Sequence, residues 1–164
     1  MSLERALAPL AVAIAVVALV VWLLLRNDIV LGPWLLALLV LAHGWVHLMF
    51  VFPKPARGGS YAGVSEYPFD FERSWLVRRA GLDLATVRII GIVTMATTFG
   101  LSVLAALATV GVLVPSAWWA GLMVGAAAAS TTMLLLFFSP ALILGLAINA
   151  LMVALVISGT WSPA

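Results

Sequence analysis

The chain has 164 residues, of which 65% are apolar and 14 are charged, 8 Lys or Arg and 6 Asp or Glu. Ten of these charges lie between Lys54 and Arg88, four precede residue 29, and the 76 residues after Arg88 carry none. A water-soluble domain cannot cover so much apolar surface, so the composition excludes a soluble enzyme and indicates an integral membrane protein. The sequence contains no cysteine, which excludes disulfides, thiolate metal sites and cysteine nucleophiles.

Five apolar segments are each long enough, at about 1.5 Å per residue, to cross a hydrocarbon core of about 30 Å. They cover residues 6–25, 31–52, 85–112, 116–138 and 140–159. The first follows Arg5 and could pass for a signal peptide, but its length favours an uncleaved helix. We therefore expect an all-α integral membrane helical bundle with five transmembrane helices, forming a single membrane domain over residues 1–164.

Turn and capping residues predict where these helices begin and end. Pro33 suits the first turn of the second helix, Asp83 is an expected N-cap of the third, and Pro115 opens the fourth. Residues 118–161 form one apolar stretch, and a single helix of that length would be about 66 Å long, twice the membrane thickness. Ser139 and Pro140 are the turn signal near its middle, so we expect two helices there.

Tryptophan and basic residues predict how the bundle crosses the membrane. Five alternating crossings place five tryptophans at helix ends on one side, where they would form an interfacial belt: Trp22, Trp34, Trp118, Trp119 and Trp161. The other side holds most of the cations: Arg5, Lys54, Arg57, Arg73, Arg78 and Arg79, with Arg88 close by. The positive-inside rule then places the N-terminus in the cytoplasm and the C-terminus outside.

The loop over residues 53–84 is the sizeable segment outside the spans, and its second half predicts a short helix that Asp70 can cap. Phe71, Trp75 and Leu76 would share an apolar side of this helix, opposite basic residues. That pattern favours a helix lying in the cytoplasmic interface over a solvated connector tucked against the bundle. The residues expected to contact lipid head groups are Arg73, Trp75, Arg78 and Arg79.

The second helix carries two histidines, His43 and His47, whose spacing places them on one face about 6 Å apart. Ionisable side chains inside a bilayer are costly and tend to mark function. One metal ion could be held by such a pair, but the chain has no third histidine. Further ligands would have to come from the cytoplasmic loop, from Glu66, Asp70, Glu72 or Asp83. We therefore expect no metal site, and the sequence requires no cofactor.

Depth counting places the strongly polar residues of the spans at one level. His43 and Asn149 lie about 14 Å above the cytoplasmic end of their helices, and His47 about 8 Å, at 1.5 Å per residue. This layer would either hold the helices together by hydrogen bonds or line a cavity that binds a ligand. Its candidate members are His43, His47, Thr94, Thr97, Thr98, Ser130, Thr131 and Asn149.

Gly121, Gly125 and Ala129 form a ridge of small residues that permits close backbone contact. The ridge would serve packing within the bundle or contact with a larger membrane complex or a second copy of the chain. The sequence has no Ser/His/Asp set, no P-loop and no paired intramembrane carboxylates, and no run of basic residues that would bind nucleic acid.

Three motifs resemble those of a family of small, uncharacterised bacterial multi-span membrane proteins. The segment from Leu41 to Leu48 is similar to their H-G-x-x-H-L helix, and the segment from Tyr67 to Leu76 to their P-F-x-F-x-R-S-W loop. Phe138-Ser139-Pro140, leading to Asn149, is similar to their last hairpin. The resemblance implies five helices and a bacterial inner membrane, and it implies no activity.

Two functions fit these features. The first is a non-catalytic small integral membrane subunit or accessory protein that docks through its helices and its basic interfacial loop. The second is a binder or carrier of a small lipophilic ligand, such as a quinone, a lipid or a haem-like cofactor, at the polar layer. His43 and His47 approach from the same side, so they cannot be the two axial ligands of one haem.

Overall fold

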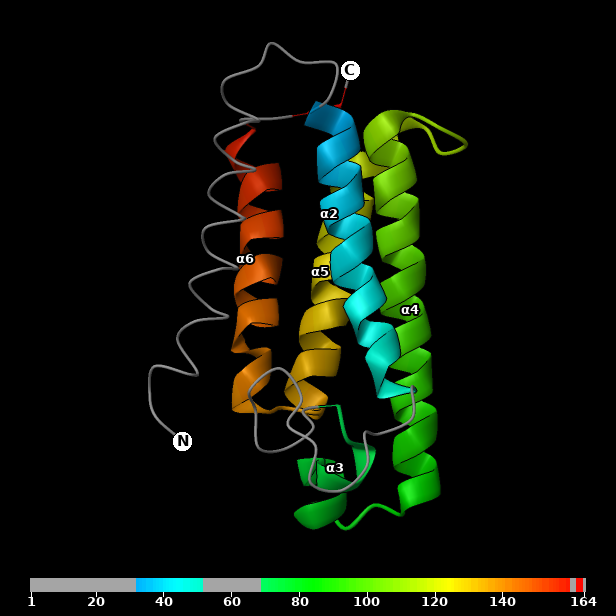
Figure 1. The fold of residues 1–164 in the computed structure, drawn as a ribbon, viewed down its shortest axis with the longest axis vertical. Coiled ribbons are helices and arrows are strands. Elements are labelled where there is room, and N and C mark those ends of the chain that lie inside the picture. The colour runs from blue at the N-terminus through cyan, green and yellow to red at the C-terminus, as the bar shows by residue number, and fades with distance from the viewer. Residues whose placement is uncertain (1–31, 52–68, 160–161, 164) are drawn as a thin grey trace.

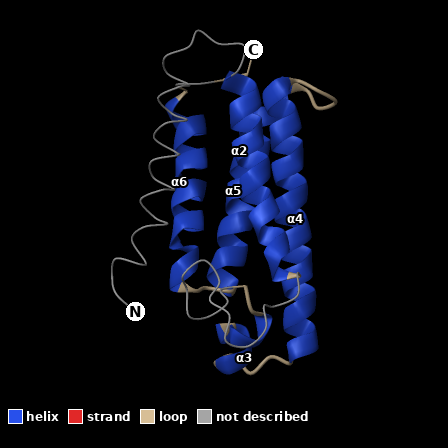
Figure 2. Cartoon of the chain, in the orientation of Figure 1, coloured by secondary structure: helices blue, strands red, loops and turns tan. Residues whose placement is uncertain are grey.

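The computed structural model describes residues 32–51, 69–159 and 162–163, and within them every regular element is a helix (Figure 1, Figure 2). The elements are α2 (Gly32–Val46), η1 (His47–Phe50), η2 (Phe71–Arg73), α3 (Trp75–Arg78), α4 (Leu84–Val110), η3 (Ser116–Trp118), α5 (Trp119–Leu136), η4 (Pro140–Leu142) and α6 (Ile143–Ser158). Four stretches are long and apolar enough to cross a membrane: 32–50, 84–110, 116–136 and 140–158. The all-α prediction and four of its helices are confirmed, whereas the expected span 6–25 lies outside the described residues.

Local chemistry explains the helix boundaries. The Asp83 carboxylate accepts a hydrogen bond from the Thr86 backbone N–H at 2.9 Å, which confirms Asp83 as the N-cap of α4. Gly111 ends α4 with a left-handed φ of 66°, a conformation that glycine adopts without steric cost. Ser139 is extended, and Pro140 occupies the first turn of η4, so the chain reverses at the predicted Ser-Pro turn.

The four long helices alternate in direction along the chain (Figure 1). α4 packs against both α2 and α5, and α5 packs against α6. One end of the bundle, here called the basic end, carries α3 and the start of α4; the opposite end carries the start of α2 and of α5. Trp34 and Trp118 are exposed at that opposite end, as expected for an interfacial belt. Trp119 is buried in the core, so its assignment to the belt is wrong, and Trp22 and Trp161 lie outside the described residues.

Two apolar clusters form the core, one toward each end of the bundle. The cluster toward the basic end comprises Phe50, Phe69, Leu76, Val87, Met95, Met133, Leu134, Phe137 and Leu142. The other comprises Val40, Ala105, Ala108, Trp119, Met123, Ala126, Ala127 and Met152. Each of α2, α5 and α6 carries one buried polar residue between the two clusters: His43, Ser130 and Asn149. These polar residues therefore lie between two apolar layers.

The segment 69–79 forms two short helices rather than one, because the backbone is extended at Ser74. Asp70 caps η2 as predicted, accepting from the Glu72 N–H at 2.9 Å, and Ser74 caps α3. The Ser74 hydroxyl also donates to the Leu136 carbonyl at 2.8 Å, and the Trp75 indole donates to the Leu135 carbonyl at 3.0 Å. These bonds satisfy carbonyls at the end of α5 that lack an intrahelical partner, and they fasten the segment to the bundle.

The predicted apolar side of this segment is divided between the core and the surface. Leu76 is buried and Phe71 packs against the core, but Trp75 is 44% exposed. The Trp75 indole N–H bonds to the Leu135 carbonyl at the end of α5, and this contact leaves the side chain partly exposed.

Close helix contacts occur at glycines other than the predicted ridge. A Cβ at Gly44 would collide with the Cβ of Ser102, so α2 and α4 approach closely at that point. Within the described residues, a Cβ at Gly121 would meet open space, and one at Gly125 would lie 3.7 Å from Leu101. The ridge of Gly121, Gly125 and Ala129 therefore makes no close backbone contact with another described helix. Its contact with a partner protein stays a prediction.

Candidate functional site

His43 and His47 meet at the place where α2 tightens into η1. His43 lies in the last turn of α2 and His47 begins η1. The His47 Nδ1 lies 3.0 Å from the His43 carbonyl oxygen, an acceptor only, so Nδ1 carries the proton and donates it. The two rings stand nearly perpendicular, with centroids 5.2 Å apart. This bond fixes the orientation of the His47 ring and leaves its Nε2 facing α5.

Side chains from α5 and α6 complete a set of buried polar contacts. The Ser130 Oγ lies 2.8 Å from the His47 Nε2, and the Asn149 Oδ1 lies 2.7 Å from the His43 Nε2. The Asn149 Nδ2 donates to the Ser130 Oγ at 2.9 Å and to the Thr131 Oγ1 at 3.0 Å. We call these five residues the polar network: His43, His47, Ser130, Thr131 and Asn149.

One arrangement of protons satisfies the polar network when both imidazoles are neutral. The His43 Nε2–H donates to Asn149 and the Asn149 amide donates to Ser130. The Ser130 hydroxyl then donates to the His47 Nε2, and the His47 Nδ1–H donates to the His43 carbonyl. Each of these four donors thus has an acceptor without an ion in the bilayer, where a charged side chain would be costly. The tautomers follow from this assignment of protons.

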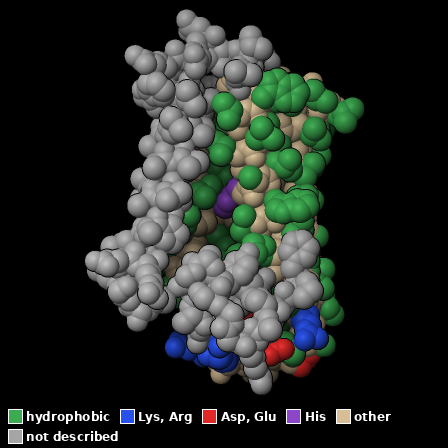
Figure 3. Space-filling model, viewed as in Figure 1, with side chains coloured by type: hydrophobic (Ala, Val, Ile, Leu, Met, Phe, Trp, Pro, Cys, Tyr) green, Lys and Arg blue, Asp and Glu red, His purple; other side chains and the backbone are tan. Residues whose placement is uncertain are grey.

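The polar network lies almost entirely out of reach of solvent and lipid. His47, Ser130 and Asn149 are each at most 2% exposed, and His43 is 9% exposed. In Figure 3, part of a histidine side chain (purple) is visible in a recess among hydrophobic side chains (green). Buried polar groups are costly unless they are bonded, so these contacts hold α2, α5 and α6 in a fixed arrangement.

The threonines of α4 do not join the polar network, although depth counting placed them in the same layer. The Thr94 hydroxyl donates to the Ile90 carbonyl and the Thr98 hydroxyl to the Thr94 carbonyl, both at 2.8 Å. Thr97 points to the exposed face of the helix. A hydroxyl within a helix is readily satisfied by the carbonyl one turn earlier, so equal depth does not bring these side chains together.

A shallow groove of about 740 Å³ runs between α5 and α6 beside the polar network. Its walls are mainly apolar and include four alanines, and three polar residues, Thr131, Thr132 and Asn149, also line it. The alanines are Ala127, Ala128, Ala150 and Ala154. Among the described contacts, the Thr131 hydroxyl oxygen accepts from Asn149 and its own proton has no acceptor. The groove thus offers one hydroxyl donor along an apolar slot.

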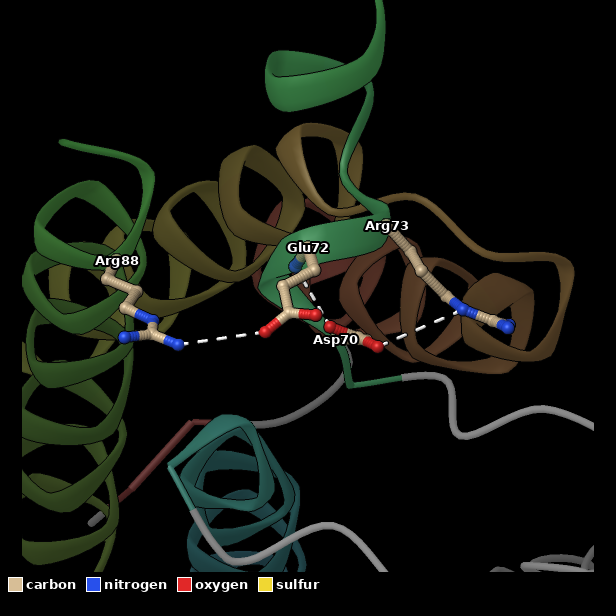
Figure 4. A network of polar contacts seen from close by, with 4 residues as sticks. All are labelled: Asp70, Glu72, Arg73 and Arg88. Carbon is tan, nitrogen blue, oxygen red and sulfur yellow. Dashed lines mark hydrogen bonds and ion pairs between the residues drawn. The ribbon is translucent and has the colours of Figure 1, made fainter. Parts of the chain in front are cut away.

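The predicted lipid-contact residues lie at the basic end, where blue and red side chains gather in Figure 3. Arg73, Arg78 and Arg79 are exposed, and their contact with head groups stays a prediction. Arg73 pairs with Asp70 at 3.9 Å and Arg88 with Glu72 at 3.7 Å, as Figure 4 shows. No group of three His, Asp or Glu side chains suited to a metal ion occurs within the described residues.

Sequence reasoning missed two features of this end. The role of Ser74 in capping α5 was not predicted, because the bond joins residues far apart in the chain. The pairing of Glu72 with Arg88 was missed for the same reason, although both residues flank the start of α4 in the sequence. The N-cap pattern before Trp75 was a signal for Ser74.

Comparisons of the chain with protein-family models, curated proteins and solved structures found no match. The resemblance to a family of small bacterial membrane proteins therefore stays a prediction.

Proposed function

We propose that the protein is a non-catalytic small membrane subunit or accessory protein that docks to a partner through its helix faces and its basic end. One observation carries this proposal: the side chains that a catalytic or ligand site would use are bonded to one another. The ring Nε2 atoms of both histidines, the amide of Asn149 and the Ser130 hydroxyl all have partners at 2.7–2.9 Å. In this interpretation the polar network stabilises the bundle, and recognition takes place on the outside.

Two surfaces suit docking. The ridge of Gly121, Gly125 and Ala129 leaves space in front of Gly121, so a helix of another subunit can approach the backbone there. The exposed Arg78 and Arg79 of the basic end offer charges to an acidic partner on the cytoplasmic side.

Mild extraction from native membranes tests the proposal directly. We expect the tagged full-length protein to migrate on size-exclusion chromatography with a partner, whose mass native mass spectrometry then reports. Gly121→Leu should release the partner, because a large side chain blocks close approach, whereas Gly100→Leu on α4 is the matched control, since a Cβ there also meets open space. A clean monomer in native membranes, unchanged by chemical cross-linking, would contradict the proposal.

The groove between α5 and α6 favours a second candidate function, the binding of a small lipophilic ligand. A ligand with a long apolar body and a carbonyl oxygen could lie along the alanines and accept a hydrogen bond from Thr131. We expect Thr131→Val to weaken retention of such a ligand, with a quinone as the probe, while Thr97→Val, on the exposed face of α4 outside the groove, leaves it unchanged. Equal quinone retention by both variants would argue against this candidate.

A further inference from the structure

A second cavity, of about 440 Å³, lies at the basic end of the bundle. One wall is aromatic and is formed by Phe50, Phe69 and Phe71. Phe50 packs edge-on against Phe69 with ring centroids 5.0 Å apart, and it stacks on Phe71 at 5.6 Å. These contacts build a fixed aromatic surface, whose ring faces attract cations.

The rim of the cavity carries charges of both signs. Asp70 and Glu72 stand on one side, and Arg88 stands on the other (Figure 4). The Glu72 carboxylate lies 3.7 Å from the Arg88 guanidinium, and both side chains are 56% exposed. This distance exceeds that of a direct hydrogen bond, and exposed ion pairs contribute little to stability. The contact between Glu72 and Arg88 is therefore an exposed ion pair without a direct hydrogen bond, at the rim of the cavity.

The cavity lies beside the first turns of α4, where the charged part of the chain ends. Arg88 is the last charged residue of the chain, and Ile89 and Ile92 after it are 63% and 47% exposed. Val51 and Ile92 form an apolar lip of the cavity. A ligand in this cavity thus has charged groups on one side and exposed apolar side chains on the other. A phospholipid head group at a membrane surface has the same environment.

We propose that this cavity binds the head group of one phospholipid that carries a primary ammonium group. The phosphate lies on Arg88, the ammonium lies between the carboxylates and the aromatic wall, and the acyl chains pass over Ile92. Asp70 and Glu72 lie beside Arg73 and Arg88, so this region carries charges of both signs. Such a region matches a head group with both a phosphate and an ammonium better than one that is only anionic. A choline head group has no N–H to donate to them, so a primary ammonium fits better. This site is independent of docking to a partner protein.

Competition among head groups tests the proposal. The purified full-length protein is mixed with equal amounts of three phospholipids of identical acyl chains, bearing ethanolamine, choline or glycerol head groups. Native mass spectrometry should detect one ethanolamine lipid retained in preference to the others. The double variant Asp70→Asn/Glu72→Gln keeps the Asp70 cap acceptor but removes both charges, and it should reduce the preference about tenfold, as loss of charge-assisted hydrogen bonds predicts. Arg88→Gln should lower retention of all three lipids.

The matched control is Arg79→Gln, which removes the same charge from an exposed residue outside the cavity and should leave the ratio of the three lipids unchanged. Glu72→Gln alone is the second variant if the double variant does not fold, and it should reduce the preference in the same direction. Equal retention of the three lipids, a preference for the glycerol head group, or a preference unaffected by Glu72→Gln would each overturn the proposal. None of these results depends on whether a partner subunit exists.

Discussion

At the scale of single residues, Asn149 contacts three other members of the polar network. Its amide oxygen faces His43, and its amide nitrogen donates to both Ser130 and Thr131. An amide has a donor and an acceptor in fixed positions, so it can join a ring N–H on one helix to two hydroxyls on another. A residue with donors alone or acceptors alone would leave a buried group unbonded, which is costly in an apolar surrounding.

Replacing Asn149 by Leu should therefore destabilise the bundle. The change leaves the His43 Nε2–H with only the more distant Ser130 Oγ, at 3.4 Å, as an acceptor. It also removes three contacts, each worth about 0.6–2 kcal/mol in membrane helices. We expect a melting temperature in detergent lowered by several degrees, as about 1 kcal/mol shifts it by 2–4 °C in a chain of this size. Thr132→Val is the control, because Thr132 is exposed and bonds only to its own helix. Equal melting temperatures for the two variants would show that the polar network does not stabilise the fold.

Asp83 should make stability depend on pH at the acid side. Hydrogen bonds from the Thr86 side chain and backbone lower the pKa of the Asp83 carboxyl below its ordinary value of 3.8. A carboxyl with a lowered folded-state pKa contributes stability above its unfolded pKa and loses that contribution as the pH falls through its folded pKa. Melting temperatures measured from pH 6 to pH 2.5 should therefore fall less for Asp83→Asn, which still caps α4, than for the wild type. Parallel pH profiles would contradict this role.

At the scale of the elements, local chemistry made the helix boundaries predictable and distant contacts did not. Pro33, Asp83 and Pro140 act on their own helix ends, so the sequence indicates them directly. Depth along a helix was also predictable, and it brought His43 and Asn149 to one level. The direction in which each side chain points around the helix axis could not be predicted, because nearly uniformly apolar helices have no polar face to orient them. That is why depth alone did not show that the Thr94 and Thr98 hydroxyls bond to carbonyls of their own helix.

The contact of α2 with α4 at Gly44 gives a test at this scale. Gly44→Ala places a methyl group against the Cβ of Ser102, which is fixed to the backbone, so the two helices must separate. We expect a lower melting temperature for Gly44→Ala and recovery in Gly44→Ala/Ser102→Gly, measured against Ser102→Gly alone. A double-mutant cycle isolates this coupling. Gly100→Ala in α4, where a Cβ meets open space, should be neutral or mildly stabilising, since Ala favours helix by about 1 kcal/mol. Additive effects of the two substitutions would mean that the helices do not approach closely there.

At the scale of the whole molecule, the two ends differ in chemistry more than the two core layers do. The basic end carries Arg73, Arg78, Arg79 and Arg88 with their acidic neighbours, and the opposite end carries exposed Trp34 and Trp118. This asymmetry is what the positive-inside rule uses, so the basic end is expected in the cytoplasm. The proposed phospholipid site would then lie in the cytoplasmic leaflet. The proposed docking of a partner to the basic end requires the same orientation of the protein in the membrane.

Labelling of single cysteines measures that orientation, because the natural chain contains none. Ala80→Cys lies in the exposed turn after α3 at the basic end, and Leu113→Cys lies in the turn between α4 and α5, where Leu113 is 91% exposed. In intact cells, a thiol reagent that does not cross membranes should label Leu113→Cys and should label Ala80→Cys only after the membrane is opened. The physical reason is the cost of moving the arginines of the basic end across the bilayer during insertion. Labelling of Ala80→Cys alone in intact cells would reverse the orientation, and it would place the basic end and its phospholipid cavity in the outer leaflet.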